Sequence, residues 1–322
     1  PPSAATGTAA RYPITDVATA PATPVRNQAK SGTCWAFGGV SLIESEAIRT
    51  RRCTLDLSEM WVVRHAYFEK AVKYVRTRGR VAFDQGGEIQ DVLWLVDRYG
   101  IVPQSLYEGG AADGTYDHAS LAKAIRRLAK RIVDKKLYEK EHWQRMIDEE
   151  LDRRLGARPD RFVIDGVAYT PFSYADSIGF RRDDYVALTS FTHHPFFERF
   201  VLEIPDNWAA HATLNIPLDS LMRLLDSALA AGYTAAWDTD VSERGFGRRA
   251  GIALLPQQEE RITLPAPEIV VDQPLRQRMF DTQATTDDHV MHIVGTAVDS
   301  LGNSYYKVKN SWGERAGRHG YW

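Results

Sequence analysis

The spacing of apolar residues changes along this chain from a helical period to a strand-like one. In the first half, apolar side chains recur at three- and four-residue steps, which is the pattern of an amphipathic helix. In the last sixty residues, short β-branched segments alternate with turns. Helices first and strands last indicate an α+β fold with segregated halves. The expected helices cover about 34–49, 58–78, 89–99, 119–155 and 218–231, and the expected strands cover 233–240, 290–298 and 304–309.

Charge and hydropathy exclude several classes of protein. The net charge is −2, which leaves no global field for nucleic acid or anionic lipid. The apolar runs are far shorter than the roughly 18 residues that cross a bilayer, so no membrane span is predicted. The basic cluster between Lys123 and Lys140 is interpreted as a solvated helix face. A nucleic-acid contact is the alternative, but no aromatic stacking pattern accompanies these charges.

The two cysteines raise the question of a reactive thiol. Cys34 lies where a loop meets a predicted helix, and the free N–H groups and the dipole there favour the nucleophilic thiolate. The alternative is a small buried apolar residue. Cys53 is interpreted as a loop thiol without a catalytic role. His193 and His194 are neighbours that would face opposite sides of a strand, so they are not expected to share a metal; no metal and no cofactor are predicted.

A cysteine nucleophile needs a base close to its sulfur and a group that holds the base in place. His289 can be the base, and Asn310, 310 − 289 = 21 residues later across the hairpin, can orient its ring. His292 is the competing candidate. Because positions three apart in a strand face opposite sides, only one of the two histidines can face the cleft. We expect His289 to be the base and His292 to be a packed or partly solvated strand residue.

These segments resemble the motifs of the papain-like cysteine peptidases. The match consists of Gln28, then Cys34-Trp35-Ala36-Phe37, then His289, then Asn310-Ser311-Trp312-Gly313. Gln28 lies 34 − 28 = 6 residues before Cys34, like the glutamine of the family's oxyanion hole. Gly86-Gly87 resembles the wall that lies beside the substrate backbone. The resemblance implies that Cys34, His289, Asn310 and Gln28 are catalytic, and that Gly86, Gly87, Trp35 and Trp312 contact substrate or cover the site.

Departures from papain indicate a narrower group. The distance 289 − 34 = 255 is about a hundred residues longer than in papain, and Ser31 replaces a disulfide cysteine. Lys30–Trp35 and the stretches 86–103, 171–189 and 310–321 instead resemble the bleomycin hydrolase and bacterial aminopeptidase C branch. The implied organisation is an extended N-terminal leader (1–23), a left helical subdomain with Cys34 (24–108), a long, mostly helical insertion (109–215) and a right β subdomain with His289 and Asn310 (216–322).

The resemblance implies hydrolysis of peptide bonds through a thiolate, with an aminopeptidase acting on short peptides as the first expectation. The alternatives are an endopeptidase with an open cleft and a non-catalytic peptide-binding relative. The expected partner is a peptide, and hexameric relatives make a homo-oligomer a further expectation. The small-residue start of the chain favours export to a bacterial periplasm over a cytoplasmic location, as if it followed a removed export signal.

Overall fold

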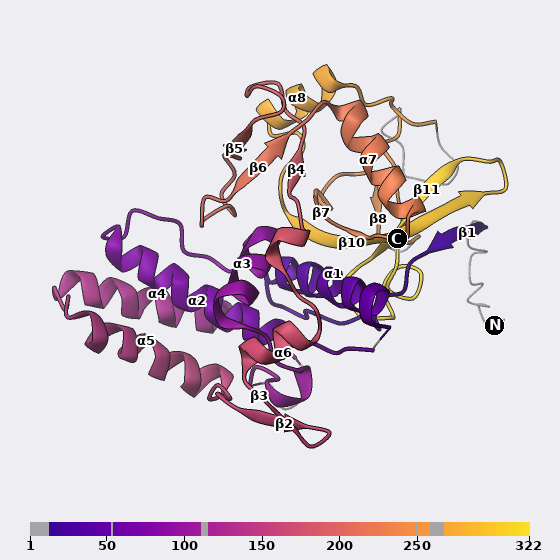
Figure 1. The fold of residues 1–322 in the computed structure, drawn as a ribbon. Coiled ribbons are helices and arrows are strands. Elements are labelled where there is room, and N and C mark those ends of the chain that lie inside the picture. Colours follow the sequence, from indigo (N-terminus) through magenta and orange to yellow (C-terminus); the bar gives the residue numbers. More distant parts are fainter. Residues whose placement is uncertain (1–12, 53, 111–114, 249, 258–266) are drawn as a thin grey trace, which may run out of the picture.

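The computed structural model describes the chain except residues 1–12, 53, 111–114, 249 and 258–266 (Figure 1). The described helices are α1 (Cys34–Arg51), α2 (Glu59–Arg76), α3 (Ile89–Tyr99), α4 (Ala119–Asp134), α5 (Lys140–Leu155), α6 (Pro171–Ser177), α7 (Leu218–Ala230) and α8 (Gln273–Asp281). The described strands are β1 (Ile14–Thr19), β2 (Phe162–Ile164), β3 (Val167–Tyr169), β4 (Leu188–Thr189), β5 (Arg199–Val201), β6 (Ala212–Asn215), β7 (Ala235–Thr239), β8 (Phe246–Gly247), β9 (Ile252–Ala253), β10 (His289–Asp299) and β11 (Ser304–Lys309).

Local sequence signals place the helices of the first half. Ser58 caps α2 by accepting a hydrogen bond from the Trp61 N–H at 3.0 Å, and Gly100 follows the last residue of α3. The segment predicted as one helix over 119–155 is two helices, because the chain turns over 135–139 with Lys136 at a positive φ of 55°. The basic residues of α4 lie on its exposed face, as the interpretation of a solvated helix face predicts.

The insertion is less helical than expected. α4 and α5 fill its first part, but residues 156–215 contain only the short α6, a 3₁₀ turn and the strands β2 to β6 (Figure 1). The prediction of a mostly helical insertion is therefore wrong for its second part. Glycines and prolines interrupt the apolar residues there, and no helical period is visible, so the apolar spacing carried no clear signal.

The main sheet is built around β10, the longest described strand. β11 pairs antiparallel along one edge of β10, in the predicted hairpin. On the other edge, β7 pairs with the first part of β10 and β1 pairs with its last part, both antiparallel. The segment predicted as an N-terminal leader thus contributes β1 to the sheet of the opposite end of the chain. Its edge position needs few apolar side chains, which explains why the sequence pattern did not reveal it.

The two halves meet where α1 packs against β10 (Figure 1). Gly38 permits this contact, since a Cβ added there would lie 2.7 Å from Cγ1 of Val290. Gly39 permits the equally close approach of Val92 in α3. Val290 belongs to the large apolar core of the helical half, whereas Met291 belongs to the small core of the β half. β10 therefore has both faces buried, and the α+β expectation holds.

Among the described helices, none is long and apolar enough to cross a bilayer.

Candidate active site

Cys34 is the first residue of α1, as predicted, and its side chain is partly buried. The backbone N–H groups of Val290 and Trp35 interact with its sulfur. Val290 directly follows His289 at the start of β10. The sulfur of the candidate nucleophile is therefore held against the segment that carries the candidate base, at the point where the two halves of the molecule meet.

His289 and Asn310 are brought together across the β10–β11 hairpin. Nε2 of His289 lies 2.8 Å from Oδ1 of Asn310, and both residues are buried. The same Oδ1 accepts the Ser311 N–H at 2.7 Å, which identifies this atom as the amide oxygen. Because an amide oxygen can only accept, Nε2 of His289 carries the proton and Nδ1 is the basic nitrogen. This is the orientation that a general base beside Cys34 requires.

Two further predicted residues surround this pair. The Trp312 ring lies 4.8 Å from the His289 ring, centroid to centroid, and covers it. Gln28 is buried, and its side chain is held at both ends: Nε2 donates to the Ser31 carbonyl at 2.7 Å, and Oε1 accepts from the Ser311 hydroxyl at 2.6 Å. The second N–H of the Gln28 amide remains for another acceptor. The structure therefore holds in place the side chain of the glutamine to which the resemblance assigns an oxyanion role.

The electrostatics of Cys34 differ from the expectation. Burial raises the pKa of its thiol to about 11, although the Val290 and Trp35 N–H groups lower it. The prediction that the helix start makes the free thiol acidic is therefore wrong, because desolvation outweighs the donors there. Burial also lowers the pKa of His289, against the hydrogen bond to Asn310, which raises it. Both shifts favour the neutral thiol and the neutral imidazole until a proton passes from one to the other.

The segment Gly86-Gly87 lies beside the candidate nucleophile, but the sequence predicts only some of the residues that surround it. Trp35 packs against this segment. The Nε1 of Trp35 donates to the Gln85 carbonyl at 3.0 Å, and a Cβ added to Gly87 would lie 3.0 Å from the Trp35 ring. Only 1% of Trp35 is exposed, so the expected contact between Trp35 and a substrate is not available. At Gly86, an added Cβ would lie 2.1 Å from Oδ2 of Asp206, so a carboxylate covers this glycine.

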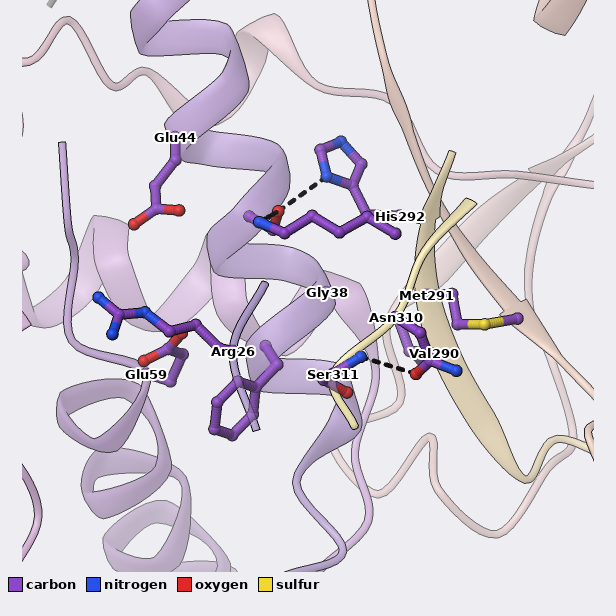
Figure 2. Close-up of a pocket in the computed structure, with 12 residues that line it drawn as sticks. Arg26, Gly38, Glu44, Glu59, Val290, Met291, His292, Asn310 and Ser311 are labelled. Atoms are coloured by element: carbon purple, nitrogen blue, oxygen red, sulfur yellow. Dashed lines mark hydrogen bonds between the residues drawn. The ribbon is translucent and has the colours of Figure 1, made fainter. Parts of the chain in front are cut away.

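His292 faces away from His289 and into the contact with α1. Its Nδ1 lies 2.8 Å from the Ser41 hydroxyl, and Figure 2 shows the ring directed toward α1, apart from Asn310. Ser41 also accepts a hydrogen bond from Nζ of Lys309 at 2.9 Å. Burial lowers the pKa of His292 to about 3, with the Lys309 charge as a smaller cause. Of the two histidines, only His289 has its ring beside Asn310, and His292 is a packed residue, as predicted.

Sequence reasoning missed an acidic group near the nucleophile. Glu88, Asp238 and Asp287 each place a carboxylate oxygen within 4.8 Å of those of the other two. Two signals were available, since Glu88 directly follows Gly86-Gly87 and Asp287 lies two residues before His289. The sequence carried no such signal for Asp238, because this residue reaches the other two carboxylates only through the strand register that sets it opposite Val290.

The argument about the adjacent histidines is also corrected. His193 and His194 do not lie in a strand, and both rings turn to Glu203, with Nε2 atoms 3.2 and 2.8 Å from its carboxylate oxygens. The three side chains have ligand atoms within 4.8 Å of one another, which the opposite-face argument had excluded. Cys53, predicted to be a loop thiol, lies outside the described residues.

The chain is similar to known cysteine peptidases and aminopeptidases. A family model described as papain family cysteine protease matches residues 13–146, and one described as peptidase C1-like family matches residues 164–322. Aminopeptidase C of Lactococcus lactis subsp. cremoris is 24% identical over 339 residues, which cover 92% of this chain and 76% of the relative. Aminopeptidase G of Lactobacillus delbrueckii subsp. lactis is 25% identical over 348 residues, which cover 94% of this chain and 77% of the relative.

A solved structure shares the fold. The crystal structure of PepW from Lactobacillus rhamnosis superimposes with a TM-score of 0.72 at 19% identity, and the match covers 96% of this chain and 78% of that one. These findings confirm the resemblance and the α+β class that the sequence predicts.

Proposed function

We propose that this chain removes residues from the amino ends of peptides, with Cys34 as nucleophile and His289 as base. The premise is that the chain is a papain-like cysteine peptidase related to the aminopeptidase C branch. One observation carries the assignment of roles. The Nε2 of His289 is bonded to Asn310 at 2.8 Å, which leaves Nδ1 to act as base, and the sulfur of Cys34 interacts with the next residue, Val290.

The reaction begins with transfer of the Cys34 thiol proton to Nδ1 of His289. The thiolate attacks the scissile carbonyl carbon, and the carbonyl π electrons move to oxygen. The collapse of this intermediate breaks the C–N bond, and His289 gives its proton to the departing amine. The acyl group stays on sulfur as a thioester. Water then attacks the thioester while His289 takes a proton from the water, and the thiolate is released and reprotonated.

Two donors support the charge on the substrate oxygen. The backbone N–H of Cys34 is free for this role as the first N–H of α1, which has no partner within the helix. The second donor is the N–H of Gln28 that does not bond to Ser31. Because both are held by surrounding structure, they need little reorganisation in the transition state, and each contributes on the order of 3 kcal/mol. Trp312 excludes water from the His289–Asn310 hydrogen bond, where it strengthens.

The experiment is digestion of a ten-residue peptide with a free amino end, followed by mass spectrometry over time. The proposal expects a ladder of products that are shortened from the amino end, and no ladder with Cys34→Ala. Fragments cut at internal bonds would identify an endopeptidase instead. In parallel, iodoacetamide labelling followed by intact mass measurement should modify Cys34 in the native chain. Absence of both the label and hydrolysis would support a non-catalytic binding protein.

A further inference from the structure

Lys70 is a buried cation that contacts the segment leading into Gly86-Gly87. It lies in α2 and is 3% exposed. Its Nζ donates to the carbonyl of Asp84 at 2.7 Å and to the carbonyl of Gly86. Both hydrogen bonds of this ammonium group therefore end on main-chain oxygens. Because a buried charge costs free energy unless hydrogen bonds compensate it, Lys70 and the two carbonyls hold one another in place.

A second buried side chain holds the residue between these two carbonyls. The Gln85 carbonyl accepts the Nε1–H of Trp35 at 3.0 Å, and Oε1 of Gln85 accepts the Gly32 N–H at 2.8 Å. The three consecutive carbonyls of residues 84–86 are thus all bonded to side chains of the helical half. Lys70 supplies two of these three hydrogen bonds and carries the charge.

The next residue, Gly87, has main-chain groups that remain available. It is buried, and its N–H and carbonyl bond to no other described residue. Buried main-chain groups are nearly always paired, so this backbone is suited to a partner such as an extended peptide. A Cβ added here would lie 2.9 Å from Oδ2 of Asp91, which leaves room for glycine alone. The resemblance assigns the wall beside the substrate backbone to this position.

Two adjacent glycines do not hold one conformation by themselves. Glycine has more backbone freedom than any other residue, and ordering it therefore costs the most entropy. A peptide that binds to an unordered wall loses affinity by this cost, whereas a wall that is ordered in advance avoids it. In the structure, the ammonium group of Lys70 bonds directly to the first of the two glycines, Gly86.

The surroundings of Lys70 keep its charge at neutral pH. Burial lowers the pKa of its ammonium group to about 8, and three carboxylates oppose this shift: Asp91 in α3, Asp206 in the insertion and Asp84. The centroid of the Trp208 ring lies 5.3 Å from Nζ, where an aromatic face stabilises a cation. Lys70 is therefore charged at pH 7 and loses its proton when the pH rises above about 8.

We propose that Lys70 is a positioning residue whose buried ammonium group holds the carbonyls of Asp84 and Gly86, and so fixes Gly86-Gly87 in the conformation that binds the backbone of the peptide substrate. Lys70 is too deeply buried to touch the substrate itself. Its contribution is therefore to substrate binding and not to the reactivity of the thiol. This inference rests on the proposed function, because it explains how the expected wall of the peptidase is ordered.

The test measures kcat and KM of Lys70→Met with a ten-residue peptide that has a free amino end. Methionine keeps much of the length of the side chain and removes its charge and its donors. KM should rise by about 10-fold, as loss of hydrogen bonds from a charged group does, while kcat changes little. The rate of Cys34 alkylation by iodoacetamide should stay the same, because this small reagent does not need the wall.

The matched control is Lys73→Met in the same helix. Nζ of Lys73 also donates to a main-chain carbonyl, but this carbonyl belongs to Trp208, outside residues 84–87. The control should leave KM unchanged. An equal rise of KM in the two variants would overturn the inference, because Lys70 would then act through the Trp208 segment.

The pH dependence of KM separates the charge of Lys70 from its size. Native KM should rise as Lys70 loses its proton above pH 8, so the ratio of the Lys70→Met value to the native value should fall between pH 7 and pH 9. The amino group of the peptide titrates alike with both proteins and cancels in this ratio. A constant ratio would contradict the inference, because the side chain would then act only by filling space.

A second variant serves if Lys70→Met does not fold. Lys70→Gln keeps N–H donors without the charge, and its KM should rise by less than about 10-fold. A native KM in either folded variant, or slower alkylation of Cys34, would show that this inference is wrong while the thiol mechanism stands. If the native chain neither hydrolyses the peptide nor reacts with iodoacetamide at Cys34, the proposed function itself fails.

Discussion

The contact between α1 and β10 contains two polar regions whose histidines have different hydrogen-bond partners. At the start of α1, His289 is bonded to Asn310 through Nε2 and is next to the residue that touches the Cys34 sulfur. Two turns along α1, His292 belongs to a buried polar network with these other members: Thr23, Ser41, Glu44 and Lys309. Burial lowers the pKa of both histidines. A lowered pKa by itself therefore does not identify which buried histidine acts as a base.

His289 and His292 differ in which ring nitrogen makes a hydrogen bond. His289 uses Nε2 for its hydrogen bond to Asn310, and Nδ1 makes none in the described part of the chain, so Nδ1 can exchange a proton with a substrate-facing thiol. His292 uses Nδ1 for Ser41, and its Nε2 is enclosed without a partner among the described residues. A proton on His292 would have no exit and would face the Lys309 charge. We expect changes in the first region to affect rate and changes in the second to affect stability.

The largest effect on rate should come from Cys34→Ala. Loss of the nucleophile should lower kcat by about 10⁴-fold or more. The free energy of unfolding should change by less than about 1 kcal/mol, because Cys34 is at the edge of the core rather than inside it. Steady-state kinetics and urea unfolding measure the two quantities. Residual turnover above a few per cent of the native rate would show that Cys34 is not the nucleophile.

His289→Ala should lower kcat by about 10²- to 10⁴-fold, as loss of a general base does. The pH profile of Cys34 alkylation is the more specific measurement. Without His289 as proton acceptor, the thiol titrates alone with a pKa of about 11, so alkylation should be slow at pH 7 and rise up to about pH 11. The native chain should already be reactive near neutral pH. An unchanged profile in His289→Ala would show that another group takes the proton.

Gln28→Ala should lower kcat by about 10- to 1000-fold with little change in KM, because one oxyanion donor is lost. Its side chain also bonds to Ser311, so a structural effect must be separated from a catalytic one. Ser311→Ala removes that hydrogen bond and keeps the amide, and it should retain most of the native rate. Equal losses in the two variants would mean that Gln28 acts by holding the Ser311 segment.

The smallest effect on rate should come from His292→Ala, whose signature is the dependence of stability on pH. His292 has a folded-state pKa of about 3 and an unfolded value near 6.5, so the unfolded chain binds the extra proton. The native chain should lose about 2 kcal/mol more than the variant in unfolding free energy between pH 7 and pH 5. Urea unfolding at the two pH values measures this. An altered alkylation profile in His292→Ala would exchange the roles of the two histidines.

Much of the fold follows from local sequence signals. The starts and ends of α1, α2 and α3 and the β10–β11 hairpin agree with the sequence within a few residues, because caps, glycines and apolar periods act over short distances. The motif segments around Cys34, His289 and Asn310 were likewise enough to identify the resemblance to the family. The strand β1 and the second part of the insertion were not predicted, since their partners or packing lie far away in the chain.

The sequence by itself determined which residues we propose to carry the chemistry, because a nucleophile, a base and an orienting amide are recognisable by type and order. Only the tertiary structure decided their electrostatic state and their neighbours. Desolvation at the α1–β10 contact, which no local pattern encodes, raises the pKa of the Cys34 thiol instead of lowering it. Strand register brought Asp238 to Glu88 and Asp287, 238 − 88 = 150 and 287 − 238 = 49 residues apart in the chain. Burial and long-range register are properties of the assembled fold, and short segments of sequence do not contain them.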